Sequence, residues 1–234
     1  MALLFGVVNT SSPIAASIPS RLTDNSSPIG AVAPELPDNI SPFMSSFEIQ
    51  AHLTIGETAR ALDLIRRSWD WYANHPNGTC STVIEGYRAN GTFGYRSERG
   101  YGYDPSYVSH AHGWSSGPTS ALTEYVVGLS VTSPADRTWK IKSQFGDLKR
   151  AEAGFVTRLG KFQAKWERAV RAYTLSFEAP VGTNGVMSLP VLNMGSEAVI
   201  TVNGKVLGSG QYALEAGHAV LNFEGDKHNI IVSY

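Results

Sequence analysis

The chain has 234 residues, of which 42% are hydrophobic, so it is long enough to bury one large core or two smaller ones. Its 19 basic and 20 acidic residues give a formal net charge of -1, which provides no electrostatic reason to expect a nucleic-acid partner. No apolar run approaches the length of a membrane-spanning helix. The single cysteine, Cys80, excludes an intramolecular disulfide and a metal site built on several thiolates.

The first forty residues are rich in Ser, Pro and Ala, and we expect them to be partly loop-like. The opening run ALLFGVV has the character of the end of an apolar helix, but it lacks the basic start and the length of a signal peptide. Glycosylation patterns of the type Asn-x-Ser/Thr nevertheless favour a secretory route and an extracellular location. They occur at Asn9, Asn25, Asn39, Asn77 and Asn90.

A helical hairpin is predicted between Pro42 and Gly78, with a turn at Gly56. Its second helix carries apolar residues at steps of three and four, which is the period of one helix face. This face places Trp69 among residues that pack in a core. The apolar positions are Leu62, Ile65, Trp69 and Tyr72.

Regular periodicity is absent from residues 79–112, where glycine alternates with tyrosine and arginine. Loops of this length inside a compact domain are uncommon unless they are functional or disordered, and the many aromatic residues argue against disorder. The next run, SSGPTSALTEYVVGL, predicts a helix that begins near Pro118 and packs on the earlier pair. We therefore expect a long structured loop between two helical elements.

From about residue 130 to the end of the chain, short runs alternate between apolar and polar residues, with Gly or Asn turns between them. This pattern predicts a small antiparallel β-sandwich. The pair Asn203-Gly204 is its clearest hairpin turn.

The segments STVIEGY, SHAHGWSSGPTSALTEYVVGL, GDL and AEAGFVTRLGKFQAKW, in this order, resemble the end of an α-L-rhamnosidase. The resemblance implies an α+β multidomain fold, in which the end of an (α/α)6 toroid, built of helical hairpins, precedes a C-terminal antiparallel β-sandwich. The corresponding domains are residues 1–129, as the C-terminal part of a glycosidase catalytic domain, and residues 130–234, as the sandwich. It implies a hydrolase that releases terminal α-L-rhamnose from rhamnosides or polysaccharides by inversion, without a cofactor.

Glu85 is the position onto which the resemblance carries the family's general base. Relatives usually have Trp where this chain has Ile84, so the pocket differs in detail. An inverting glycosidase needs a carboxylate that removes a proton from the attacking water. A β-prone run before Glu85 and a glycine after it would let the backbone fix this carboxylate in a loop close to a ligand.

The candidates for contact with the sugar are His112, on which the resemblance places a sugar-site residue, and nearby aromatic rings that offer flat apolar faces. His110 and His112 are two residues apart, but no further ligands occur at a spacing recognised for metals, so we expect no metal. The alternative for each ring is simple packing in the core. The aromatic candidates are Trp71, Tyr87, Tyr95 and Trp114.

A second carboxylate must protonate the leaving group, and in the family it lies in an upstream acidic motif that no segment of this chain matches. Glu35, in the loop PELPDN, is the one other acid that we would test. The expectation is a fragment that is weakly active or inactive alone. Two alternatives stay open, namely a noncatalytic carbohydrate-binding protein and a polysaccharide lyase with Tyr87, Tyr95 or His112 as its base.

Overall fold

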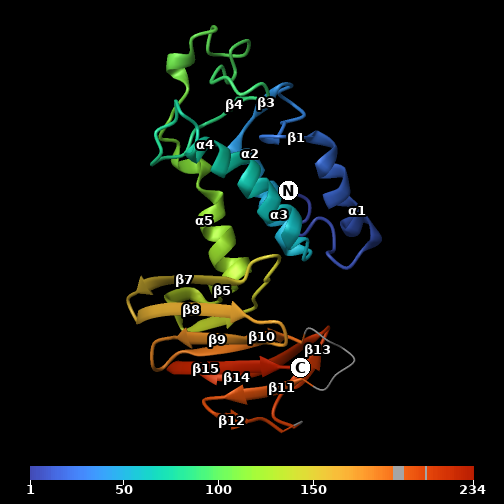
Figure 1. Ribbon diagram of the computed structural model, residues 1–234, viewed down its shortest axis with the longest axis vertical. Helices are drawn as coiled ribbons and strands as arrows, with labels where there is room; N and C mark the ends of the chain where they lie inside the picture. Colours follow the sequence, from blue (N-terminus) through green and yellow to red (C-terminus); the bar gives the residue numbers. More distant parts are fainter. Residues whose placement is uncertain (192–197, 209) are drawn as a thin grey trace. The chain divides into compact units, whose positions relative to one another are not determined.

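The computed structural model describes residues 1–191, 198–208 and 210–234. The chain forms two compact units, Met1–Ala121 and Leu122–Tyr234, each with its own internal contacts (Figure 1). Among the described residues, no helix has the length and apolar character needed to cross a membrane. The assignment of residues 1–129 to a catalytic domain stays a prediction.

The predicted helical hairpin is present in the first unit as α2 (Pro42–Thr54) and α3 (Thr58–Ile65). The hydroxyl of Ser41 accepts a hydrogen bond from the Met44 amide, 3.5 Å away, and so caps α2. The second helix continues through a π-helical stretch, η2 (Arg66–Asp70), into α4 (Trp71–Ala73). Helices α2 and α3 pack on each other, as the apolar face predicts.

The loop between the hairpin and the next helix is long and mostly irregular, as predicted. It contains only the short elements β4 (Tyr87–Arg88), η3 (Pro105–Tyr107) and η4 (Gly113–Ser115). Strand β4 pairs antiparallel with β3 (Asn39–Ile40), which ties this loop to the chain before α2. The helix that follows, α5 (Gly117–Ala121), packs on α2, as expected.

The first forty residues differ from the prediction in two ways. Residues 2–8 form turns rather than a helix, because Gly6 adopts a φ of 69°, outside the helical region. Residues predicted to be loop-like instead form α1 (Pro13–Leu22), which Ser12 caps and Pro13 begins. Short elements complete this region, namely η1 (Thr23–Asn25), β1 (Ser26–Ser27) and β2 (Gly30–Ala31).

The second unit begins with the π-helical η5 (Leu122–Val127) and then forms two sheets. The five-stranded sheet has the order β13-β14-β10-β6-β5, and the six-stranded sheet has the order β12-β11-β15-β9-β8-β7. The strands are β5 (Leu129–Val131), β6 (Thr138–Ile141), β7 (Arg150–Thr157), β8 (Gly160–Arg168), β9 (Ala172–Glu178), β10 (Asn184–Pro190), β11 (Val199–Val202), β12 (Lys205–Val206), β13 (Ala213–Glu215), β14 (His218–Glu224) and β15 (Lys227–Ser233), with the 3-10 turn η6 (Pro134–Asp136) before β6.

These sheets confirm a mainly antiparallel sandwich, with one exception. Strands β6 and β10 run parallel, with Trp139 opposite Gly185, because a long excursion through β7, β8 and β9 separates them along the chain. The hairpin predicted at Asn203-Gly204 joins β11 to β12, and both residues have positive φ, 50° and 80°.

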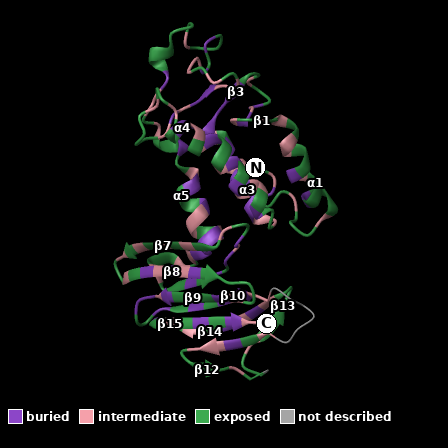
Figure 2. Ribbon diagram, in the orientation of Figure 1, coloured by how far each residue is buried: buried purple, intermediate pink, exposed green. Residues whose placement is uncertain are grey.

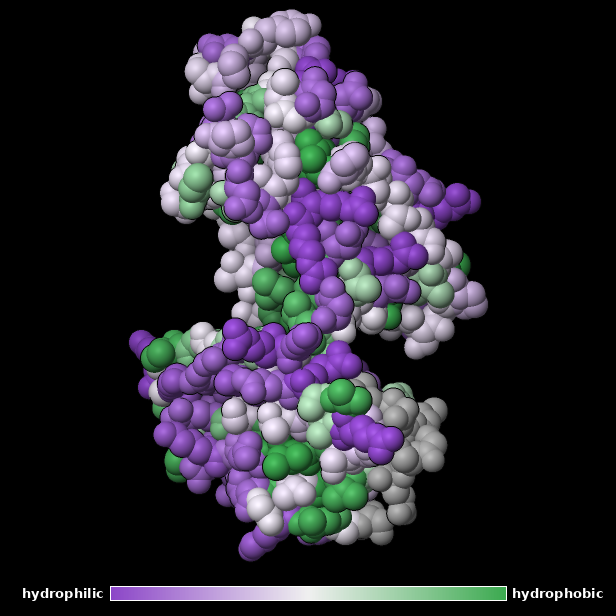
Figure 3. Space-filling model, viewed as in Figure 1, coloured by the Kyte–Doolittle hydropathy of each residue, from purple (hydrophilic) through white to green (hydrophobic). Residues whose placement is uncertain are grey.

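The core of the sandwich is built from alternate residues of each strand, and Figure 2 shows the buried and exposed positions along β8, β9 and β15. Trp139 of one sheet and Phe177 of the other are 5.0 Å apart between ring centroids, so the two sheets meet through aromatic side chains. The face of the chain seen in Figure 3 is largely hydrophilic, with separate hydrophobic patches on each unit.

Candidate active site

Two stretches of the irregular loop lie side by side and hold Glu85 between them. The Glu85 amide donates to the Ser109 carbonyl oxygen at 2.8 Å, and the His112 amide donates to the Val83 carbonyl oxygen at 2.8 Å. The Thr82 hydroxyl also donates to the carbonyl oxygen of His110. The β-prone run before Glu85 therefore pairs with residues 109–112, and this pairing fixes the backbone of the predicted base.

The carboxylate of Glu85 accepts two hydrogen bonds and is half-buried. The Tyr101 hydroxyl donates to Oε1 at 2.6 Å, and the Ser109 amide donates to Oε2 at 3.1 Å. An ionised carboxylate has about four lone-pair sites, so these contacts orient it and leave acceptor sites for a water molecule. The arrangement suits a group that receives a proton.

Tyr101 contacts a carboxylate through its hydroxyl and a guanidinium through its ring. The hydrogen bond to Glu85 raises the pKa of the Tyr101 hydroxyl, because loss of its proton would place two negative charges together, and burial raises this pKa further. The Arg96 guanidinium lies over the Tyr101 ring, 5.3 Å from its centroid. The Arg96 amide donates at 3.0 Å to the side chain of Asn39, which links this part of the loop to β3.

A hydrophobic cluster supports the loop that carries Glu85. Ile84, the neighbour of the carboxylate, is buried in it, as are Tyr87 and Tyr95. Gly86 is required here, because a Cβ at this position would overlap the ring of Tyr95. The residue that follows the predicted base therefore allows close packing of an aromatic ring against the backbone.

Two of the predicted sugar contacts, Tyr87 and Tyr95, belong to this core instead. Tyr87 is fully buried, its hydroxyl is 2.7 Å from that of Ser68 and donates to the Ile29 carbonyl oxygen at 2.6 Å, and burial raises its pKa. The ring of Tyr95 is almost fully buried. Trp71 is half-buried and packs on Tyr87, with ring centroids 4.3 Å apart. The three rings therefore pack in or against the hydrophobic cluster that supports the loop.

The other two candidates remain accessible. Trp114 is 72% exposed, and its ring packs against that of Phe43, with ring centroids 5.2 Å apart. His112 is half-buried, and its ring centroid lies 6.2 Å from that of Trp114. His110 is different, because its Nδ1 is 2.9 Å from the Tyr72 hydroxyl and its ring packs against Phe93. Of the two histidines, the structure therefore leaves His112 for a ligand.

Residues 128–203 match the family model described as the bacterial alpha-L-rhamnosidase C-terminal domain. No curated protein matches the chain in a sequence comparison. Solved α-L-rhamnosidases are similar in fold. The enzyme of Dictyoglumus thermophilum is 16% identical with a TM-score of 0.68, over 82% of this chain and 21% of that one.

Two further structures agree. The α-L-rhamnosidase of Streptomyces avermitilis, solved in complex with L-rhamnose, is 18% identical with a TM-score of 0.61, over 80% of this chain and 17% of that one. The enzyme of Aspergillus terreus is 22% identical with a TM-score of 0.59, over 96% of this chain and 23% of that one. The chain resembles the C-terminal portion of an α-L-rhamnosidase.

The similarity to α-L-rhamnosidases is better supported for the second unit than for the first. The family model covers the start of the sandwich but not Glu85, and at these identities the solved structures establish the fold alone. The chain spans between 17% and 23% of the length of the three solved enzymes. The role of Glu85 therefore rests on its local geometry and stays a prediction.

Other predicted positions lie elsewhere in the first unit. Glu35 is exposed and lines a groove together with Glu48, and its backbone carbonyl oxygen accepts a hydrogen bond from Arg99. Cys80 is an exposed free thiol. Among the described residues, no group of three or more His, Cys, Asp or Glu side chains could hold a metal ion.

The sequence did not reveal the partners of the Glu85 carboxylate. Tyr101 lies 16 residues away and Ser109 lies 24 residues away, across a loop with no periodicity. The only sequence signal was the density of tyrosines in this loop, which does not distinguish Tyr101 from Tyr95 or Tyr103. The Ser109 contact comes from a backbone amide, so no side-chain pattern could indicate it.

Proposed function

We propose that the chain carries the general-base end of the active site of a glycoside hydrolase that releases terminal α-L-rhamnose from rhamnosides or rhamnose-containing polysaccharides. The observation that supports this proposal is the Glu85 carboxylate, fixed by the Tyr101 hydroxyl and the Ser109 amide with acceptor sites to spare. His112 and the exposed ring of Trp114 then supply a hydrogen-bonding group and a flat apolar face for the sugar.

In the proposed inverting reaction, Glu85 takes a proton from a water molecule as the water oxygen attacks the anomeric carbon. The bond to the leaving group breaks at the opposite face, and a carboxylic acid roughly 6.5–9.5 Å from Glu85 protonates the departing oxygen. We propose that this acid comes from residues outside these 234, since the chain spans about a fifth of its solved relatives. The chain alone is then a weak rhamnosidase or an inactive one.

The leaving group offers a direct test. Dinitrophenolate departs without protonation, so dinitrophenyl α-L-rhamnoside needs the base but not the acid, whereas methyl α-L-rhamnoside needs both. We expect the chain to release dinitrophenolate slowly and to leave the methyl glycoside intact. Glu85→Gln should lower the first rate roughly 10²- to 10⁴-fold, the usual contribution of general base catalysis.

Glu98→Gln is the matched control, because Glu98 lies in the same loop but pairs with Arg88 at 2.6 Å. It should leave the rate unchanged. Equal rates in the chain and in Glu85→Gln would remove Glu85 from the proposal. Rapid hydrolysis of the methyl glycoside, lost in Glu85→Gln, would instead show that an acid is present in this chain.

A noncatalytic carbohydrate-binding function is the second candidate, and the 72% exposure of Trp114 favours it. It predicts that L-rhamnose shifts the tryptophan fluorescence equally in the chain and in Glu85→Gln, and that Trp114→Ala abolishes the shift. A lyase is less well supported, because Tyr87 and Tyr95, two of its three candidate bases, are buried. Release of a product that absorbs as an unsaturated uronate would favour the lyase.

We also propose an extracellular location, on the basis of the glycosylation patterns. Asn9, Asn77 and Asn90 are exposed, but Asn39 is buried and bonds to Pro37 and Arg96. In a secretory host we therefore expect glycans on the exposed sites and none on Asn39, because its amide is engaged inside the fold. Peptide mass spectrometry after deglycosylation checks this. The absence of glycans from every exposed site would argue against secretion.

A further inference from the structure

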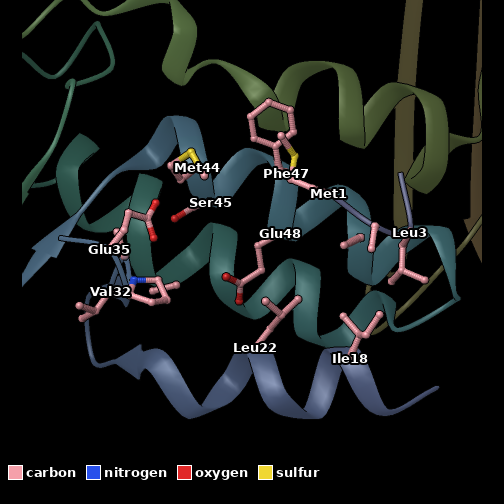
Figure 4. Close-up of a pocket in the computed structure, with 15 residues that line it drawn as sticks. Met1, Leu3, Ile18, Leu22, Val32, Glu35, Met44, Ser45, Phe47 and Glu48 are labelled. Atoms are coloured by element: carbon pink, nitrogen blue, oxygen red, sulfur yellow. The ribbon is translucent and has the colours of Figure 1, made fainter. Parts of the chain in front are cut away.

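A groove opens between α1, α2 and the segment 31–35 in the first unit (Figure 4). It encloses a cavity of about 190 Å³, which is large enough for one long side chain rather than for a sugar chain. Its walls are mostly aliphatic and aromatic. They include Leu3, Ile18, Leu22, Val32 and Phe47.

The carboxylate of Glu48 lies among these apolar walls, as Figure 4 shows. Its side chain is only 14% exposed, and its one partner in the described part of the chain is Nε2 of His52, 3.5 Å away. His52 is itself buried, and its Nδ1 has no hydrogen-bond partner. A largely buried carboxylate is costly unless it is paired and hydrogen-bonded, so this pair is under-satisfied.

Glu35 adds a second negative charge to the lining, from an exposed position in the segment 31–35. Of the residues that the structure describes, no lysine or arginine side chain lines this groove, and the arginines nearest to Glu48, Arg60 and Arg67, line a separate hollow. Among the described residues, no ion pair joins the Met1 amino group to Glu35 or Glu48. The groove therefore combines apolar walls with net negative charge, which is complementary to an aliphatic chain that ends in a cation.

Several hydrophobic residues close to Leu3 and Ile18 in the sequence are exposed, and one of them, Met1, lines the groove. The N-terminal turns and α1 leave several large hydrophobic side chains in water, although such side chains are usually covered when they occur together. They are Met1, Phe5, Val7 and Ile14, with exposed fractions of 56%, 67%, 79% and 64%. Exposed apolar area beyond the groove favours a polypeptide occupant over a small amine.

We propose that this groove binds a polypeptide segment from outside these 234 residues, which inserts a lysine or arginine side chain between the apolar walls. The aliphatic stem of that side chain lies against Leu22 and Phe47, and its cationic end pairs with Glu48, with Glu35 as a second acceptor. The cation gives the Glu48 carboxylate a second partner beside His52, and neighbouring apolar residues of the segment cover the exposed hydrophobic side chains.

Two short peptides test this proposal on the full chain. The probes are acetyl-Leu-Leu-Lys-Leu-Leu-amide and the same peptide with glutamine in place of lysine, titrated against the protein by NMR. We expect the lysine peptide to bind roughly tenfold more tightly, as a charge-assisted hydrogen bond in a partly buried site allows. A pentylammonium ion alone should bind more weakly than the lysine peptide, because it covers less apolar surface.

Three variants locate the effect. Glu48→Gln keeps the shape of the side chain and should remove the preference for lysine, and Glu35→Gln, at an exposed position that folding tolerates, should reduce it. Glu57→Gln is the control, because Glu57 is an exposed acid that pairs with Arg60 outside the groove. Equal affinity for the two peptides, no binding of either, or a preference that survives Glu48→Gln in a variant with an unchanged thermal transition would overturn the proposal.

Discussion

At the residue scale, the contact between Glu85 and Tyr101 orients the carboxylate that we propose as the base. The sequence could indicate Glu85, because a family resemblance and a turn-like glycine pointed to it. It could not indicate Tyr101, because that contact is made by a loop whose path follows from tertiary packing. The same packing places Tyr87 and Tyr95 in the core, although their sequence context is no different from that of Tyr101.

The titration of Tyr101 reports this contact. Its raised pKa means that folding favours the neutral hydroxyl, so the stability it contributes is present below its ordinary pKa of about 10 and is lost as pH rises through the raised value. In Glu85→Gln the anion is absent, and we expect the Tyr101 pKa to fall toward its ordinary value. NMR of labelled tyrosines, assigned with Tyr101→Phe, measures it.

Glu98→Gln serves as the control for this titration, because Glu98 pairs with Arg88, whereas the hydrogen bond to Glu85 is the largest cause of the raised pKa of Tyr101. An unchanged Tyr101 pKa in Glu85→Gln would contradict the contact. An equal fall in both variants would show that the cause is general charge rather than the hydrogen bond.

At the scale of elements, most of the regular segments could be predicted from the sequence, whereas the contacts made by the irregular segments could not. The hairpin α2–α3 and the alternating strands are set by apolar periodicity, which local sequence carries. Helix α1 was missed because its segment is rich in Ser, Pro and Ala and contains Pro19, although Ser12 and Pro13 form a recognisable start. The parallel pairing of β6 with β10 was also missed, because it joins strands that are far apart in the chain.

The contact between α5 and α2 gives a prediction at this scale. A Cβ at Gly117 would overlap the side chain of Ser46, so Gly117→Ala forces the two helices apart. We expect a loss of about 1–3 kcal/mol in the free energy of unfolding, as overpacking costs, despite the better helix propensity of alanine. Chemical denaturation measures it.

Gly113→Ala is the matched control, because a Cβ at Gly113 would meet no atom within 4 Å. It should change the stability by less than about 0.5 kcal/mol. Equal effects of the two substitutions would mean that the close approach of α5 to Ser46 is not what requires a glycine.

At the scale of the whole molecule, the chain combines a helical unit that carries the candidate base with a sandwich that resembles the C-terminal domain of bacterial α-L-rhamnosidases. The change of hydrophobic period near residue 130 predicts two parts, but the units divide between Ala121 and Leu122, because η5 packs with the strands of the sandwich. Composition and periodicity could not predict activity, because a glycosidase needs a second carboxylate whose position depends on the complete site. We therefore propose that Glu85 acts as a base on water at the anomeric carbon, as one half of that site.

Azide rescue of Glu85→Ala tests this claim most directly. Removal of the carboxylate opens space beside the anomeric carbon, and azide, which needs no deprotonation, can attack there in place of water. With dinitrophenyl α-L-rhamnoside, we predict that azide restores dinitrophenolate release in Glu85→Ala, and that NMR identifies the product as β-L-rhamnosyl azide. A rate that does not respond to azide, or a product that retains the α configuration, would exclude Glu85 as the general base of an inverting reaction.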